Sequence, residues 1–107
     1  EALQGYRQVL GDAHPNTLTS INNLAGLLRA RGWLDDAEPL YREALQGRRR
    51  RLGDAHPQTL VSISHLAMLL KVRGRLDEAE PLSREALQGY REELGDTHPN
   101  TLTSINN

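Results

Sequence analysis

The chain has 107 residues and no cysteine, which excludes a disulfide scaffold, a thiolate nucleophile and a cysteine-based zinc site. Its formal net charge is −1, with thirteen Lys and Arg against fourteen Asp and Glu, so no bulk field marks it for nucleic acid or an anionic membrane surface. No apolar run approaches the roughly twenty residues of a membrane span. We therefore expect one soluble domain with no membrane partner and, by default, a cytoplasmic location.

A segment of 42 residues recurs along the chain. The motif GDAHPNTL begins at Gly11, returns as GDAHPQTL at Gly53, and returns again as GDTHPNTL at Gly95. The two full units are identical at 29 of 42 aligned positions, and this regularity indicates a repeat array. We divide the single array, 1–107, into a partial second helix at 1–10, repeats at 11–52 and 53–94, and a partial first helix at 95–107.

Each full unit predicts two antiparallel helices. In the first unit, Pro15 stands where helices accept proline, and apolar residues recur at helical spacing from there until Gly32. A second apolar series ends at Gly53, where glycine accepts a positive φ easily. We expect this second helix to begin at residue 35 or 36, because a late start leaves Pro39 harmless.

These spacings resemble a known repeat family. The pattern I-x-x-L-A-x-x-L at 21–28, followed by A-x-x-x-Y at 37–41, is similar to the tetratricopeptide repeat. The 42-residue length and the segments HPNTLTSINNLAGLL and DDAEPLYREAL look most like the long repeats of kinesin light chain. The resemblance implies an all-α fold, an α-solenoid wound as a right-handed superhelix of antiparallel helix pairs, with the first helices lining the concave side.

The two full repeats differ along one stripe of the first helix. At about 100° per residue, the differing positions fill one arc roughly 120° wide, opposite the apolar packing positions. We call this arc the variable stripe, and the resemblance places it in the inner groove, where we predict a peptide-binding surface. Its predicted binding residues are Thr19, Asn22, Asn23, Gly26, Arg29 and Trp33, then Val61, Ser64, His65, Met68, Lys71 and Arg75, and finally Asn106.

An alternative explanation is that exposed positions differ because nothing constrains them. Against it, the exposed positions Glu38 and Arg42 of the predicted second helix recur unchanged as Glu80 and Arg84. Exposure alone has therefore not produced difference everywhere, although a recent duplication also explains such identity.

The stripe carries cations and amides, which suit an extended acidic peptide. Asparagine pairs with a peptide main chain through both a donor and an acceptor, and Arg and Lys hold carboxylates. The resemblance to kinesin light chain implies, as one candidate, recognition of a short acidic segment that contains an aromatic residue. Motor function does not follow from it. For Trp33 we leave two roles open, an aromatic groove contact or a cap on the helix turn.

Two sets of residues resemble catalytic or ligand sites. His14, His56 and His98 occur once per repeat, too far apart to share an ion, so we predict packing and capping beside Asp12, Asp54 and Asp96. His65 has no partner at metal-ligand spacing, and no nucleophile, base and orienting group form a set. We expect no enzyme, no cofactor and no metal.

The second set is the arginine run at 48–51. The equivalent positions read Tyr-Arg-Glu-Glu at 90–93, so the array does not extend a basic patch. We predict a solvated helix end rather than a phosphate site, and nucleic acid is the disfavoured partner.

Both partial units carry core-like residues, namely Leu3, Tyr6, Val9 and Leu10 in the first and Leu102 and Ile105 in the last. We expect them to expose apolar surface on which a second copy of the chain stacks head to tail. The leading prediction is a protein-interaction scaffold that binds a peptide in its groove. The alternative is a structural, self-assembling array with no dedicated ligand.

Overall fold

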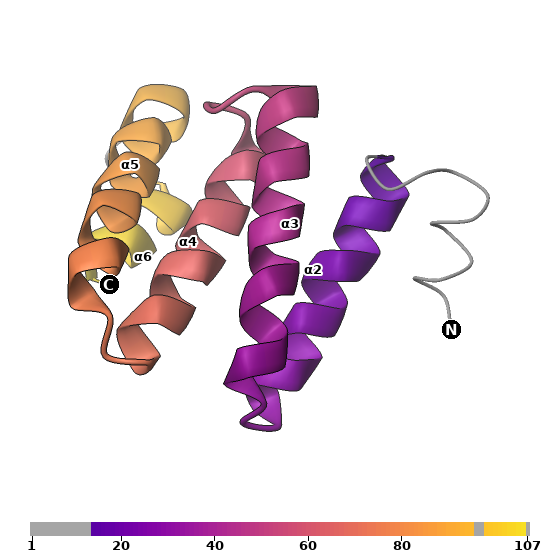
Figure 1. The fold of residues 1–107 in the computed structure, drawn as a ribbon. Coiled ribbons are helices and arrows are strands. Elements are labelled where there is room, and N and C mark those ends of the chain that lie inside the picture. Colours follow the sequence, from indigo (N-terminus) through magenta and orange to yellow (C-terminus); the bar gives the residue numbers. More distant parts are fainter. Residues whose placement is uncertain (1–13, 96–97, 107) are drawn as a thin grey trace.

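The computed structural model describes residues 14–95 and 98–106, and helices account for most of them (Figure 1). No strand occurs in these ranges, which confirms the all-α prediction. The predicted partial second helix at 1–10 lies outside the described residues. The helices are α2 (Pro15–Ala30), α3 (Leu34–Leu52), α4 (Pro57–Val72), α5 (Leu76–Leu94) and α6 (Pro99–Asn106).

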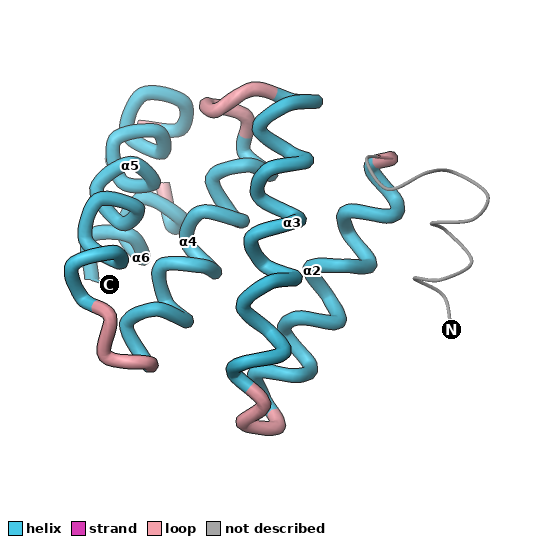
Figure 2. The backbone as a smooth tube through the Cα atoms, viewed as in Figure 1, coloured by secondary structure: helices cyan, strands magenta, loops and turns pink. Residues whose placement is uncertain are grey.

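Successive helices run antiparallel and are joined by short turns (Figure 2). Each helix contacts the next along the chain, from α2 against α3 to α5 against α6. The result is an elongated stack of helical hairpins that measures 40 × 28 × 20 Å. This nearest-neighbour arrangement defines an α-solenoid.

The first helix of each full repeat begins at a histidine and a proline. His14 and His56 have extended backbones, and their Nδ1 atoms accept hydrogen bonds from the backbone N–H groups of Asn16 and Gln58, both at 3.1 Å. The following proline occupies the first turn, where its missing N–H costs no helical hydrogen bond. The capping role predicted for these two histidines is confirmed, and the imidazole itself is the cap.

The aspartate expected beside the second of these caps has another partner. Asp54 accepts a hydrogen bond from Arg49 at 2.9 Å and does not cap α4. Asp12 and Asp96 lie outside the described residues, and His98 stands directly before α6 with its carbonyl accepting from the Leu102 N–H at 3.0 Å.

The second helix begins earlier than the sequence indicated. The chain turns at Gly32, whose φ is +81°, and the Ala37 N–H already bonds the Trp33 carbonyl at 3.1 Å. Trp33 is therefore the N-cap, α3 starts at Leu34, and Pro39 lies inside the helix. The prediction of a start at 35 or 36 is wrong because this tight turn closes within two residues. Proline at this depth removes one helical hydrogen bond, at an exposed position.

Small residues set the distance between the helices of a hairpin. A Cβ added to Gly47 of α3 would lie 2.5 Å from Cδ2 of Leu18 in α2, a side chain with only 2% of its surface exposed. The same close approach brings Gly89 of α5 against Leu60 of α4. The hairpin is thus packed at a distance that only glycine permits at these positions.

Ion pairs join the second helix of one repeat to the next repeat. Near the C-terminal end of α3, Arg49 donates to both carboxylate oxygens of Glu85 in α5, at 2.6 and 2.9 Å. Near the N-terminal end of α3, Arg73 reaches Asp35 at 2.6 Å and Arg75 reaches Glu38 at 2.6 Å. Neighbouring repeats are therefore connected at both ends of α3.

Candidate peptide-binding groove

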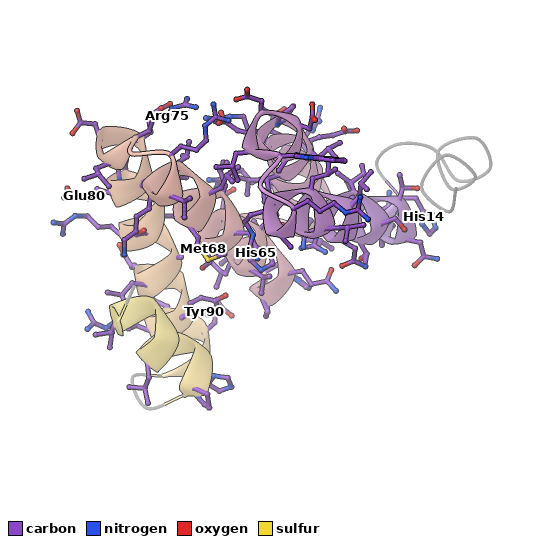
Figure 3. The ribbon with its side chains drawn as sticks, turned by 90° about the horizontal axis from the view of Figure 1, so that it is seen from below. His14, His65, Met68, Arg75, Glu80 and Tyr90 are labelled. Atoms are coloured by element: carbon purple, nitrogen blue, oxygen red, sulfur yellow. The ribbon has the colours of Figure 1, made fainter. Side chains whose placement is uncertain are left out.

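The variable stripe brings its central residues together where the row of helices bends. In Figure 3, His65 and Met68 of α4 lie near Tyr90 of α5 on the inner side of this bend, whereas Arg75 and Glu80 lie away from them. The first helices supply the residues that meet here, because their opposite faces carry the buried core, including Leu18, Ile21 and Ala25 of α2.

One direct contact joins the stripes of two repeats. Asn22 of α2 and His65 of α4 lie side by side, with Asn22 Nδ2 at 3.2 Å from His65 Nδ1. The Tyr41 ring of α3 packs at a tilt beneath the imidazole, with 5.7 Å between ring centroids. We call the surface around this contact the α2–α4 step of the groove.

The α2–α4 step is electropositive. Burial lowers the pKa of His65, and the nearby guanidinium groups of Arg29 and Arg48 lower this pKa further. A neutral imidazole with an unprotonated Nδ1 accepts the hydrogen bond that Asn22 Nδ2 donates, so the observed contact agrees with the direction of the shift.

Arg29 is held in place by the aromatic residue under the step. Its Nε donates to the Tyr41 hydroxyl at 3.2 Å, and Tyr41 has only 1% of its surface exposed. Arg29 itself is half-buried. One side of its guanidinium is thus fixed by a rigid partner, which lowers the entropy cost of binding a further group.

The sequence analysis missed Arg48 as a groove residue. The expectation of a solvated helix end is wrong at this position, because Arg48 is only 6% exposed. Its Nη1 donates to the Gln58 carbonyl at 3.1 Å and to Ser62 Oγ at 2.9 Å, and its Nη2 reaches Thr19 Oγ1 at 3.5 Å. The side chain therefore passes from α3 between α2 and α4.

The repeat comparison held a signal for this residue. Position 48 is arginine in the first repeat and tyrosine in the second, and Tyr90 is likewise buried, at 4% exposure. Burial raises the pKa of Tyr90, and a hydrogen bond with Ser64 of the stripe opposes that rise. The signal was overlooked because the difference falls on the second helix and within a run of four arginines, of which Arg50 and Arg51 are exposed.

Two stripe residues are engaged at the helix turns. Arg75 pairs with Glu38 at 2.6 Å and with Glu78 at 2.5 Å, so carboxylates of the chain already balance its charge. Trp33 caps α3, is 51% exposed, and has the guanidinium of Arg31 at 5.4 Å from its ring centroid. This position favours the capping role over the groove role for Trp33.

The remaining predicted residues differ in exposure. Within the described part of the chain, Thr19, Asn23 and Lys71 are exposed, and Asn22, Gly26, Val61, Ser64 and Met68 are half-buried. The side chain of Asn106 is not among those described. The stripe is thus an open surface, and the surface hollows at residues 74–78 and beside Asp54 and Glu85 lie elsewhere.

Two further kinds of feature were searched for across residues 14–95 and 98–106. No group of three or more His, Cys, Asp or Glu side chains could hold a metal ion there. No helix within the same ranges is long and apolar enough to cross a membrane.

The fold and the open surface together define a class, an α-solenoid of repeated helical hairpins that presents its first helices along one side. The sequence profile of the tetratricopeptide repeat matches residues 17–58 and 59–100. The chain belongs to this family, whose repeats mediate protein–protein interaction and scaffolding. The matched units keep the 42-residue period but begin six residues later than the units chosen above.

Solved structures of similar fold come from Podosopora anserina. One is a protein described as a kinesin light chain with nearly identical TPR-like repeats, and the other is a single-substitution variant of it. Each is 26% identical to this chain, with a TM-score of 0.90 over 95% of this chain and 48% of theirs. The chain thus spans about half the length of these structures. No curated protein matches it.

Proposed function

We propose that this chain is an interaction scaffold whose groove binds an extended, acidic peptide segment. The observation that carries the proposal is the electropositive α2–α4 step, where Arg29 and Arg48 both act on His65. A carboxylate bound there would meet favourable charge from two elements, α2 and α3. Positive potential in a partly water-excluded site strengthens such a contact over its value in bulk water.

The composition of the stripe supports the same ligand. None of its predicted binding residues is Asp or Glu, so a carboxylate approaching it meets no like charge from them. The amides of Asn22 and Asn23 offer both donors and acceptors for a peptide main chain. Main-chain pairing gives affinity without sequence preference, and the cations then select acidic side chains.

The test is binding of a fluorescein-labelled hexaglutamate peptide, followed by fluorescence anisotropy, with hexaglutamine as the uncharged comparison. The variant Arg29→Glu/Lys71→Glu reverses two stripe charges. Arg75 is left unchanged because its reversal would also disturb its pairs with Glu38 and Glu78. The matched control, Arg50→Glu/Arg51→Glu, introduces the same charge change at exposed positions outside the stripe.

We expect the stripe variant to bind hexaglutamate at least tenfold more weakly and the control to bind within about twofold of the unmodified chain, because only direct charge contacts exceed about 1.4 kcal/mol. Equal losses in both variants would mean that net charge alone attracts the peptide. Binding of hexaglutamine as tight as that of hexaglutamate would remove the acidic preference.

A second candidate function is head-to-tail assembly. Leu102 and Ile105 of α6 are 47% and 46% exposed, whereas the equivalent Leu18 and Ile21 of α2 are 2% and 0% exposed. In α2 these positions are covered by the second helix of their own hairpin, so the α6 face fits a helix of the α3 type. We propose a second copy of this chain as its source.

Sedimentation velocity over a wide concentration range tests this assembly. Species that grow with concentration, and that Ile105→Asp abolishes, are the expected result. Ala30→Asp, at an exposed position of α2, is the matched control and should leave assembly unchanged. A monomer at every concentration would contradict the second candidate without affecting peptide binding.

A further inference from the structure

A buried cation lies one side chain below the surface of the groove. The hydrogen-bond partners of Arg48 among the described residues are all neutral oxygens, from Gln58, Ser62 and Thr19. An arginine removed from water without a carboxylate partner carries a desolvation penalty that neutral acceptors compensate only in part. Consistent with this, burial lowers the pKa of Arg48.

The guanidinium keeps donor capacity on the side of the groove. Nη1 is committed to two acceptors at 3.1 and 2.9 Å, but Nη2 meets only Thr19 Oγ1, at the long distance of 3.5 Å. That distance lies beyond the usual range for an N–H···O bond. Because Thr19 is exposed on the variable stripe, a rotation of one small side chain separates Nη2 from a ligand in the groove.

The second repeat shows the same position in a neutral form. Tyr90 projects from α5 as Arg48 projects from α3, and its hydroxyl interacts with Ser64 of α4. The next residue, Arg49, recurs as Arg91, so the change from arginine to tyrosine is confined to the buried position. Each step of the groove therefore has its own residue beneath it.

We propose that Arg48, together with Arg29, forms a carboxylate-binding subsite at the α2–α4 step, and that the buried second-helix position decides the charge preference of each step. The inference rests on the proposed function, because it names the part of the groove that reads an acidic side chain. Arginine at this position selects a carboxylate, and tyrosine selects an uncharged group.

The repeat itself supplies the test substitutions. Arg48→Tyr gives the first repeat the residue that already folds at the equivalent place in the second, and Arg48→Lys keeps the charge without the planar donor fork. Arg48→Tyr/Tyr90→Arg moves the cation by one repeat and keeps the composition. Arg51→Tyr is the control, since Arg51 is exposed on the same helix. Thermal unfolding by circular dichroism establishes that each variant is folded.

The probe is the hexaglutamate peptide. We expect Arg48→Tyr to weaken its binding about ten- to hundredfold, which is the range of a lost charge-assisted contact. Arg48→Lys should bind with intermediate affinity, and Arg51→Tyr should bind like the unmodified chain. In the double variant the cation lies under the α4–α6 step, so affinity for this uniform peptide should recover to within about tenfold.

A measurement on the unmodified chain needs no variant. The pKa of His65, followed by NMR, should rise on binding hexaglutamate, because a carboxylate beside the imidazole favours its charged form. An unchanged pKa in the bound state would overturn the placement of the carboxylate.

The remaining outcomes separate the two proposals. Equal hexaglutamate affinity for Arg48→Tyr and the unmodified chain would overturn the role of Arg48 and leave peptide binding intact. Failure of the unmodified chain to bind hexaglutamate would overturn both.

Discussion

The substitution Gly47→Ala tests how rigidly the hairpin of α2 and α3 is packed. The new Cβ would lie 2.5 Å from Leu18 Cδ2, 3.0 Å from Cδ1 and 3.3 Å from Cγ. Such distances require either Leu18 or the helix to move, and Leu18 has 2% exposure and little free space. Overpacking of this kind costs about 1–3 kcal/mol.

Helix propensity acts in the opposite direction. Replacing glycine by alanine inside a helix stabilises by roughly 1 kcal/mol, so the net effect of Gly47→Ala is a destabilisation of about 1 kcal/mol. For a chain of this size that corresponds to a decrease in Tm of about 4 °C. Gly26→Ala is the matched control, because its Cβ would meet Tyr41 Oη at an ordinary 3.6 Å, and we expect it to raise stability by up to about 1 kcal/mol.

The assay is urea denaturation followed by circular dichroism, in the presence and absence of Leu18→Ala. Removing the leucine methyl groups relieves the clash, so Gly47→Ala should become stabilising in that background, a coupling between the two positions that a double-mutant cycle measures. If Gly47→Ala stabilises equally in both backgrounds, the close approach of the helices does not limit the packing, and the reasoning is wrong.

Three further predictions concern caps, ion pairs and pH. His56→Ala removes the acceptor for the Gln58 N–H and should cost about 1 kcal/mol of unfolding free energy in urea titrations, whereas His56→Asn should retain most of it. Arg49→Met breaks the two-pronged pair with Glu85, and because both partners are partly exposed the double-mutant coupling should stay below about 1 kcal/mol and decrease in salt; a larger, salt-independent coupling would contradict this. The folded state holds the pKa of His65 below its usual value, so the unfolded chain takes up a proton first, and stability should fall as pH drops through about 6.5 towards the folded-state pKa and then show no further change from this group. His65→Asn should lack this component of the pH dependence, and an identical pH profile in urea titrations would contradict it.

The sequence was sufficient for the fold because the repeat states its own pattern more than once. Period, helix pairing and glycine-terminated second helices all follow from apolar spacing and from Gly53, and residues 14–95 and 98–106 bear them out. The start of α3 could not be predicted to the residue, because Pro39 is tolerated inside the helix once the turn at Gly32 places Trp33 at the cap.

The groove was harder to predict because its composition depends on contacts between repeats. Helical geometry places Asn22, Arg29 and His65 on one stripe, but it says nothing of a second-helix residue that reaches the same place. Arg48 enters the α2–α4 step only because α3 lies behind both first helices. Likewise, the charge of Arg75 counts for little in the groove because Glu38 comes from the preceding repeat.

The ion pair between Arg49 and Glu85 has a consequence for how such a chain can lengthen. Both residues are repeated in register, as Arg91 and as Glu43, so every unit carries one half of the connection to the unit before it and the other half for the unit after it. A duplicated block of 42 residues inserted at any junction would arrive with both halves in place. Growth by copying therefore needs no new interface to evolve, and selection is left free to act on the buried residue beneath each new step.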